Sequence, residues 1–230
     1  MKEGRNTMRK YLFDTHIHTK EASSCSREWA ADIVKRYKEL GYDGLVITDH
    51  FSASQFERHG DTFDEQVLKY LSGYRAAKEL ETEDFHVILG MELRFLENDN
   101  DYLVYGFDEE FVLENDLTKF NDPEEFRPFA ESNNLIIFQA HPFRIGMTVI
   151  DPELLDGVEV YNGHGDHNSR NSVAYKWAEM HGLRKLSGSD FHGNISMEPG
   201  GVYFDEYYTD SKQVAQALKD GKYTLKIYTE

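Results

Sequence analysis

The sequence predicts an α/β fold: a small TIM-like barrel forming a single domain over residues 1–230. Short, nearly all apolar segments alternate with segments of helical periodicity, which is typical of a parallel sheet buried on both faces. The chain is long enough for one sizeable domain, and it contains no repeat, linker or low-complexity tract. Because about seven strands alternate with helices, we expect a parallel barrel rather than an open doubly wound sheet.

The first half of the chain alternates strands and helices from residue 11 onward. Apolar residues recur at helical spacing over residues 27–40, with Ser26 as the expected N-cap and Gly41 just beyond the C-terminus. A second helix is expected over residues 64–81. The strands expected in this half are residues 11–13, 44–48, 85–89 and 102–107.

The second half opens with a strong helix start at residues 122–125. Asp122 is the expected N-cap, Pro123 occupies the first helical position, and Glu125 lies at the third. This helix is expected to end near Asn133. The remaining strands are expected at residues 135–138, 158–161, 183–186, 202–204 and 223–227, with helices at 169–181 and 211–220.

The amino-acid composition of the chain limits the kinds of partner that it is expected to bind. The chain has 25 Lys and Arg against 42 Asp and Glu, and its net charge of −17 argues against a broad surface for nucleic acid or anionic membrane. It contains no run approaching the ~20 apolar residues of a membrane span, and residues 1–10 are charged without an apolar leader core. Cys25 is the only cysteine, so no intrachain disulfide can form. We expect a cytoplasmic protein, and the sequence does not indicate its oligomeric state.

Five short apolar runs end in residues that bind metals. Because strand ends meet at one rim of a barrel, polar side chains at those ends would converge there. This arrangement is typical of a metal-dependent hydrolase. The five segments are residues 14–18, 48–50, 90–92, 140–142 and 188–192.

Three of these segments, residues 14–18, 48–50 and 188–192, combine histidine with aspartate. In the first, His16 and His18 are two residues apart, so a strand directs both imidazoles to the same face and one metal can bind both. Asp14 is then free to support a ligand or to face the interior. Taken alone, the pair could also be two surface histidines. The other two segments, with Asp49 before His50 and Asp190 before His192, repeat the pattern and favour metal binding.

Glu92 and His141 complete the predicted rim. Glu92 lies just beyond the third expected strand, where a carboxylate can bridge two cations, although a lone glutamate there is more often a solvated charge. His141 precedes Pro142, and the proline fixes the chain just after the imidazole.

Together these segments resemble the polymerase and histidinol phosphatase (PHP) superfamily of metal-dependent phosphoesterases. The similarity continues through residues 159–162 and the glycine pair 200–201, so it covers nearly the entire chain. The resemblance implies a distorted (β/α)7 barrel that holds two or three Zn, Mn or Fe ions and hydrolyses phosphate esters. The implied ligands are His16, His18, Glu92 and Asp190 for the first ion, Glu92 and His141 for the second, and His50 and His192 for the third.

The chain departs from the family pattern at two places. Where the family commonly has a histidine after the bridging glutamate, this chain has Asp101, which could bind a hard metal through oxygen, with Asp108 as another possible substitute. The residue that usually completes the third site falls within residues 20–25, where only Glu21 and Cys25 are good ligands.

The expected chemistry is hydrolysis by a water that two or three metals activate, with no side-chain nucleophile. Asp190 could orient this water, and His192 or His50, if not fully committed to a metal, could protonate the leaving oxygen. Arg144, three residues after His141, is the best candidate for gripping the phosphate, with a surface salt bridge as the alternative. Further candidates for the phosphate pocket are Lys20, Arg170, Asn162, His164 and His167.

Three functions are compatible with the sequence. The first is hydrolysis of a small phosphorylated substrate, such as the phosphomonoester histidinol phosphate, a nucleotide or a related diester. The second is a phosphotyrosine-type protein phosphatase, which would need a basic or aromatic groove that the acidic sequence does not clearly supply. The third is a barrel whose metals serve structure or binding within a complex, and the retention of so many rim ligands argues against it.

Overall fold

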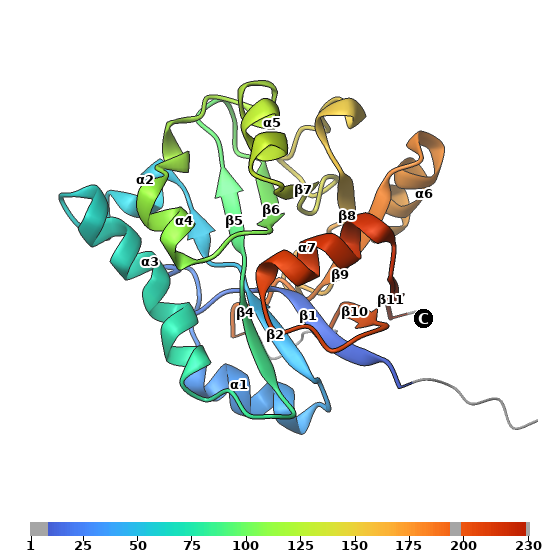
Figure 1. Cartoon of the computed structure of the whole chain (residues 1–230). Coiled ribbons are helices and arrows are strands. Elements are labelled where there is room, and N and C mark those ends of the chain that lie inside the picture. Colours follow the sequence, from blue (N-terminus) through green and yellow to red (C-terminus); the bar gives the residue numbers. More distant parts are fainter. Residues whose placement is uncertain (1–8, 194–198, 229–230) are drawn as a thin grey trace, which may run out of the picture.

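The computed structural model describes residues 9–193 and 199–228 and has a mixed α/β fold (Figure 1). Residues 1–8, which carry most of the charged N-terminal segment, lie outside the described residues, as do 194–198 and 229–230. The strands are β1 (Tyr11–Ile17), β2 (Gly44–Ile47), β3 (His50–Phe51), β4 (His86–Leu89), β5 (Met91–Arg94), β6 (Asp101–Tyr105), β7 (Ile136–Gln139), β8 (Gly157–Asn162), β9 (Arg184–Gly188), β10 (Gly201–Phe204) and β11 (Tyr223–Lys226). The α-helices are α1 (Ala30–Glu39), α2 (Ala53–Phe56), α3 (Phe63–Lys78), α4 (Glu109–Glu114), α5 (Pro123–Ser132), α6 (Asn171–His181) and α7 (Ser211–Asp220), and short 3-10 turns lie at Leu117–Lys119 and Pro152–Leu154.

The described strands form two sheets. One has the order β11-β10-β1-β2-β4 and the other β3-β5-β6-β7-β8-β9. The alternation of strands and helices is confirmed, but the prediction of a wholly parallel sheet is wrong, because β6 runs antiparallel to both β5 and β7, and β10 runs antiparallel to β1 and β11. The cause at β6 is the short connection 95–100, since a parallel crossover needs a dozen or more residues.

The two sheets adjoin where their strands end. Gly90 alone separates β4 from β5, and a parallel bridge pairs Ile17 at the end of β1 with Phe191 just after β9. The amide of Thr48 also donates to the Ile17 carbonyl at 2.8 Å, which ties the end of β2 to β1. These contacts bring the ends of both sheets to one edge, and closure into a (β/α)7 barrel stays a prediction.

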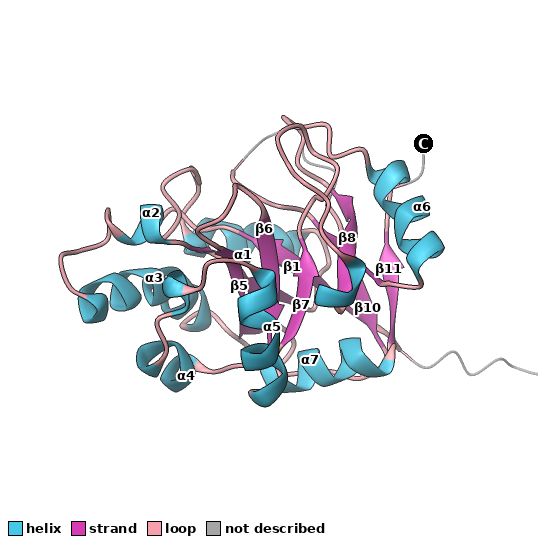
Figure 2. Ribbon diagram, turned by 90° about the horizontal axis from the view of Figure 1, so that it is seen from above, coloured by secondary structure: helices cyan, strands magenta, loops and turns pink. Residues whose placement is uncertain are grey.

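The core lies between the strands and their covering helices. One cluster of buried side chains combines Phe13, Leu103 and Phe138 from the strands with Val214 and Leu218 of α7. Figure 2 shows α7 running along one side of the strands, while long loops gather at the opposite side. Polar side chains on the loops at that side can therefore lie outside the apolar core.

Of the two predicted N-caps one is confirmed, and Gly41 follows the C-terminus of α1 as predicted, with a φ of 79°. Asp122 caps α5, accepting a hydrogen bond from the Glu125 amide at 2.8 Å. Ser26 does not cap α1, which begins at Ala30. Its hydroxyl instead donates to the His18 carbonyl, and the Glu21 carboxylate accepts from the Ala30 amide at 3.0 Å. A tertiary contact to the segment after β1 therefore replaces the expected local cap.

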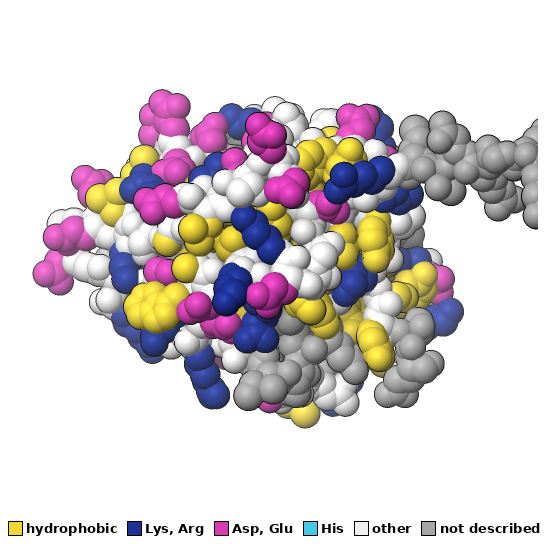
Figure 3. All heavy atoms as spheres, turned by 90° about the horizontal axis from the view of Figure 1, so that it is seen from below, with side chains coloured by type: hydrophobic (Ala, Val, Ile, Leu, Met, Phe, Trp, Pro, Cys, Tyr) yellow, Lys and Arg dark blue, Asp and Glu magenta, His cyan; other side chains and the backbone are white. Residues whose placement is uncertain are grey.

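The surface carries charges of both signs. On the face that Figure 3 shows, Lys and Arg side chains are interspersed with Asp and Glu. Within the described part of the chain, no helix is both long and apolar enough to cross a membrane.

Candidate metal centre

The first group of metal-type ligands is built on the end of β1. The Nε2 atoms of His16 and His18 lie 3.1 Å apart, and each is 3.4 Å from Oδ1 of Asp190. Nδ1 of His16 is 2.9 Å from Oε1 of Glu159, which leaves Nε2 to face the cluster. All of these side chains are buried. The i and i+2 spacing thus brings two imidazoles together as the sequence indicated.

Glu92 lies between the ligand groups. It belongs to β5, where it pairs with His50 of β3, and not to a loop after a strand as the sequence suggested. Its Oε1 is 3.1 Å from His16 Nε2 and 3.2 Å from His141 Nε2, while its Oε2 is 3.2 Å from His18 Nε2. Burial alone would raise the pKa of Glu92, but the surrounding imidazoles hold it well below its usual value. The carboxylate is placed to bridge two cations.

Asp101 joins the cluster from β6. Because β6 is antiparallel to β5, its first residue lies at the edge where β5 ends. Its Oδ2 is 3.9 Å from His141 Nε2, and one ligand atom each of His50, Glu92 and Asp101 lie within 4.8 Å of one another. Asp108, the other possible substitute, instead caps α4 and pairs with Lys212. The structure therefore places Asp101 at the site.

A third group contains only imidazoles. Ligand atoms of His18, His50 and His192 lie within 4.8 Å of one another. Nε2 of His192 is also 3.1 Å from the sulfur of Cys25. Burial would raise the pKa of the Cys25 thiol, but hydrogen bonds with His192 and His50 lower it to about 5. Glu21, the alternative ligand from this segment, is not brought to the group, because its carboxylate caps α1.

Two of the expected ligands have unusual backbone conformations. His141 and Asp190 have φ values of 29° and 51°, a region that non-glycine residues rarely adopt and that often marks functional sites. Beside Asp190, the amide of Ser189 donates to the buried Asp14 carboxylate at 3.0 Å. Burial raises the pKa of Asp14 to about 6. Asp14 thus ties β1 to the segment that carries Asp190.

Glu159 and Asn162 form hydrogen bonds that hold two of the expected metal ligands, His141 and Asp190, in position. Oε2 of Glu159 accepts from the His141 amide at 3.0 Å and from the Asn162 side chain at 2.8 Å. The Asn162 amide also donates to Asp190 at 3.1 Å. From the sequence, Asn162 was expected in the phosphate pocket and Glu159 had no assigned role. A carboxylate inside the apolar run 158–161 was the signal that could have identified it.

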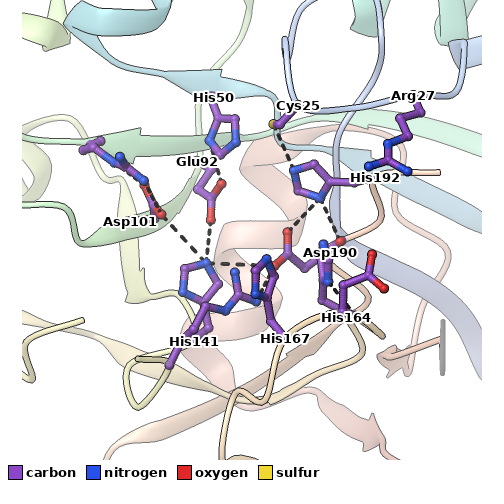
Figure 4. A pocket seen from close by; sticks show the side chains of 13 residues that line it. Cys25, Arg27, His50, Glu92, Asp101, His141, His164, His167, Asp190 and His192 are labelled. Carbon is purple, nitrogen blue, oxygen red and sulfur yellow. Dashed lines mark hydrogen bonds and ion pairs between the residues drawn. The ribbon is translucent and has the colours of Figure 1, made fainter. Parts of the chain in front are cut away.

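A cavity of about 440 Å³ opens onto the cluster (Figure 4). Arg144 lines it, donating to Asp190 Oδ2 at 2.6 Å and to Asn162 Oδ1 at 2.9 Å. Its Nε is buried and has no hydrogen-bond partner among the described residues. The cavity is lined by Cys25, Arg27, His50, Glu92, Arg94, Asp101, His141, Arg144, His164, Asp166, His167, Asp190 and His192.

Four basic residues are placed differently from the expectation. Arg27 and Arg94 line the cavity although neither was predicted to; Arg94 lies two residues after Glu92 on the same strand face, which was a usable signal. Lys20 instead lies over the Trp29 ring, 4.7 Å from its centre. Arg170 donates to the Phe143 carbonyl and lines a separate neighbouring hollow.

The ligand atoms present suit divalent transition metals. Imidazole nitrogens and carboxylate oxygens face one another at 3.1–3.4 Å inside a buried cluster. The buried carboxylates of Glu92 and Asp190 contact these imidazoles, and a bound cation would offset their charge further. A mixed nitrogen and oxygen set of this kind is typical of Zn, Mn and Fe sites. The group of His16, His18 and Asp190 and a second group of His50, Glu92 and Asp101 fit the expected metals.

In this mixed α/β fold, histidine and carboxylate side chains meet at the edges of the sheets. A site of this kind is typical of metalloenzymes. The chain belongs to the PHP domain family, because the family model for the PHP domain matches residues 14–229. No curated protein matches the chain.

Solved structures share the fold. A two-domain protein from Bacteroides vulgatus, described as containing a predicted PHP-like metal-dependent phosphoesterase, has a TM-score of 0.67 and 16% identity over 96% of this chain; the chain spans 65% of that protein. PsfC from Pseudomonas syringae has a TM-score of 0.66 and 19% identity, covering 96% of this chain and 93% of its own. Endonuclease Q in complex with a duplex bearing an abasic lesion has a TM-score of 0.61 and 15% identity, covering 92% and 57%.

Proposed function

We propose that this protein is a metal-dependent hydrolase of small phosphate esters, acting on a phosphomonoester such as histidinol phosphate or on a nucleotide. The observation that carries the proposal is the position of Glu92 between the imidazoles of His16, His50 and His141, at a cavity lined by Arg144. The cavity, about 440 Å³, has the size of a small-molecule site. This supports a small phosphorylated substrate over a phosphotyrosine-bearing protein surface.

Some residues of the site would bind the metal ions, and others would contact the substrate. The first ion would be bound by His16, His18, Glu92 and Asp190, and the second by Glu92, His141 and Asp101. The bound ions would polarise the phosphoryl oxygens and make a water more acidic. The carboxylate Oδ1 of Asp190 faces His16 and His18 while its Oδ2 accepts from Arg144, so Asp190 joins the ion site to the phosphate position.

Arg144 and two histidines supply the remaining roles. The guanidinium of Arg144 lines the cavity and is 15% exposed, so it offers a charged donor to a phosphate oxygen. His50 and His192 line the cavity beside the ligand groups, where either one, when it does not bind a metal, could give a proton to the leaving alkoxide. His164 and His167 lie at the cavity wall, where a substrate would contact them.

The test is a screen of phosphorylated metabolites with metal-free protein that is reloaded separately with Zn²⁺, Mn²⁺ or Fe²⁺. Phosphate release should depend on the added metal and should favour a small ester. Glu92→Gln removes the bridging charge, so it should lower turnover by orders of magnitude while circular dichroism stays unchanged. Near-normal turnover in that variant, or no phosphate release with any metal, would contradict the proposal.

A further inference from the structure

If His18 binds the first metal ion, the third ligand group lacks one of its three imidazoles. An imidazole nitrogen offers one lone pair to a cation, and Nε2 of His18 faces His16, Glu92 and Asp190. The Nδ1 of His18 lies 3.3 Å from the Ser23 hydroxyl and is thus engaged elsewhere. Only His50 and His192 then remain for the third position. Two imidazoles alone fall short of the four ligands of a closed tetrahedral site.

Cys25 lies where a further ligand is missing. Its sulfur is 3.1 Å from Nε2 of His192 and faces the cavity that His50 also lines (Figure 4). Nδ1 of His192 is 3.0 Å from the Asp190 carbonyl, which can only accept a hydrogen bond, so Nε2, the nitrogen that faces the sulfur, is the one that could bind a cation. The sulfur and this nitrogen thus face each other without an intervening side chain.

The segment that carries Cys25 is held in place. The hydroxyl of Ser26 donates to the His18 carbonyl at 3.0 Å, and the amide of Arg27 donates to the His192 carbonyl at 3.0 Å. On the other side, the Ser23 hydroxyl donates to Asp49 at 2.6 Å. Hydrogen bonds on both sides of Cys25 therefore fix the loop against the two histidine-bearing segments, as a metal site requires.

We propose that Cys25 is a thiolate ligand of the third metal position, together with His50 and His192, and that this position takes a thiophilic ion such as Zn²⁺. The inference rests on the proposed metal-dependent function. Sulfur and imidazole ligands favour Zn²⁺, whereas the other two groups include the carboxylates of Glu92, Asp101 and Asp190, which also suit harder ions. The thiolate would donate an electron pair to the cation, and any proton still on the sulfur would pass to solvent.

The alternative is that Cys25 is a nucleophile with His192 as its base, because a thiol beside an imidazole is also the arrangement of a nucleophilic cysteine. The two roles predict opposite behaviour of the loaded protein. A ligand sulfur is shielded from alkylation and gives a charge-transfer band with cobalt, whereas a nucleophile stays reactive and gives none.

The experiment titrates the metal-free full chain with Co²⁺ and follows the near-ultraviolet thiolate-to-cobalt charge-transfer band. In the parent protein the band should grow until the protein is saturated. Cys25→Ser should lose the band and one bound ion. Cys25→Asp should restore the ion without the band, because a carboxylate also ligates. His192→Ala should lose the band although its thiol is intact, and His181→Ala, which removes an exposed imidazole from α6, should keep it.

A second readout is alkylation of the single thiol by iodoacetamide. The metal-free protein should react readily, since Cys25 is accessible, and Zn²⁺ should protect it. A protein that is fully loaded with cobalt yet shows no band and alkylates as fast as the metal-free form overturns the proposal. Neither readout depends on turnover. An active, loaded protein without the band therefore refutes the role of Cys25 alone, whereas a protein that binds no metal refutes the proposed function as well.

Discussion

At the scale of single residues, Arg144 is where the proposed phosphate recognition can be tested separately from metal binding. Its guanidinium contacts Asp190 and Asn162 but cannot ligate a cation, and the side chain lines the cavity where a substrate would bind. The alternative of an exposed surface salt bridge does not describe it, because the pair with Asp190 is largely buried. One charged side chain thus couples the ligand cluster to the cavity.

We expect Arg144→Ala to leave the metal content unchanged and to lower kcat/KM by the equivalent of ~1.5–3 kcal/mol, the range of a charged hydrogen bond. A rise in KM with steady kcat would show contact in the ground and transition states alike, and a fall in kcat would show contact mainly in the transition state. Inhibition by inorganic phosphate should weaken in the variant.

The matched control is Arg170→Ala, which removes an arginine from the neighbouring hollow. It should change neither phosphate inhibition nor kcat/KM. If Arg144→Ala and the parent protein show equal phosphate inhibition and equal kcat/KM, Arg144 lies outside the substrate site, and Arg27 or Arg94 becomes the next residue to test.

At the scale of elements, the site depends on the close approach of β9 to β1. Gly188 ends β9, and a Cβ added there would lie 2.4 Å from the Cβ of His16 and 3.0 Å from Oε1 of Glu159. No side chain fits in that space. The glycine therefore allows the strand carrying His16 and the segment carrying Asp190 to meet.

Gly188→Ala should push β1 and β9 apart, so that the protein binds less metal and unfolds at a lower temperature. Elemental analysis after dialysis and thermal unfolding measure the two effects. Asp122→Ala is the matched control: it removes the N-cap of α5, should cost about 1 kcal/mol in the free energy of unfolding, and should leave the metal content intact. Full metal binding by Gly188→Ala would show that the strands tolerate the added methyl group.

At the scale of the whole molecule, the chain has a negative net charge and also buries several carboxylates. The net charge is −17, and Glu92, Asp101, Glu159 and Asp190 are all buried around one cluster. Imidazoles and arginines offset part of this charge. Divalent cations that bind the folded chain and not the unfolded one would offset more.

Metal removal should therefore destabilise the protein. A free metal concentration ~100 times the dissociation constant should add ~2.7 kcal/mol to the free energy of unfolding for each site that is filled only in the folded state. Thermal unfolding followed by circular dichroism, with and without a chelator, measures this shift. Glu92→Gln should show a smaller shift. Identical midpoints with and without metal would mean that the cluster does not hold ions.

Local sequence patterns were sufficient to predict the alternation of strands and helices and most of the ligand cluster. Periodicity and caps are local, so α5 and α7 could be placed from a few residues each. The ligands followed because apolar runs ending in His, Asp or Glu are local as well. His16 and His18 needed only the two-residue repeat of a strand.

Contacts between distant segments account for the rest. The antiparallel β6 brings Asp101 to the edge, and tertiary hydrogen bonds, not local spacing, assign Glu21 to α1 and Cys25 to His192. The positions of Lys20, Arg27 and Arg170 were likewise beyond local reasoning, because long, flexible side chains take their direction from the neighbours that they meet. A sequence specifies which groups can bind, whereas the packing of distant strands determines which of them converge.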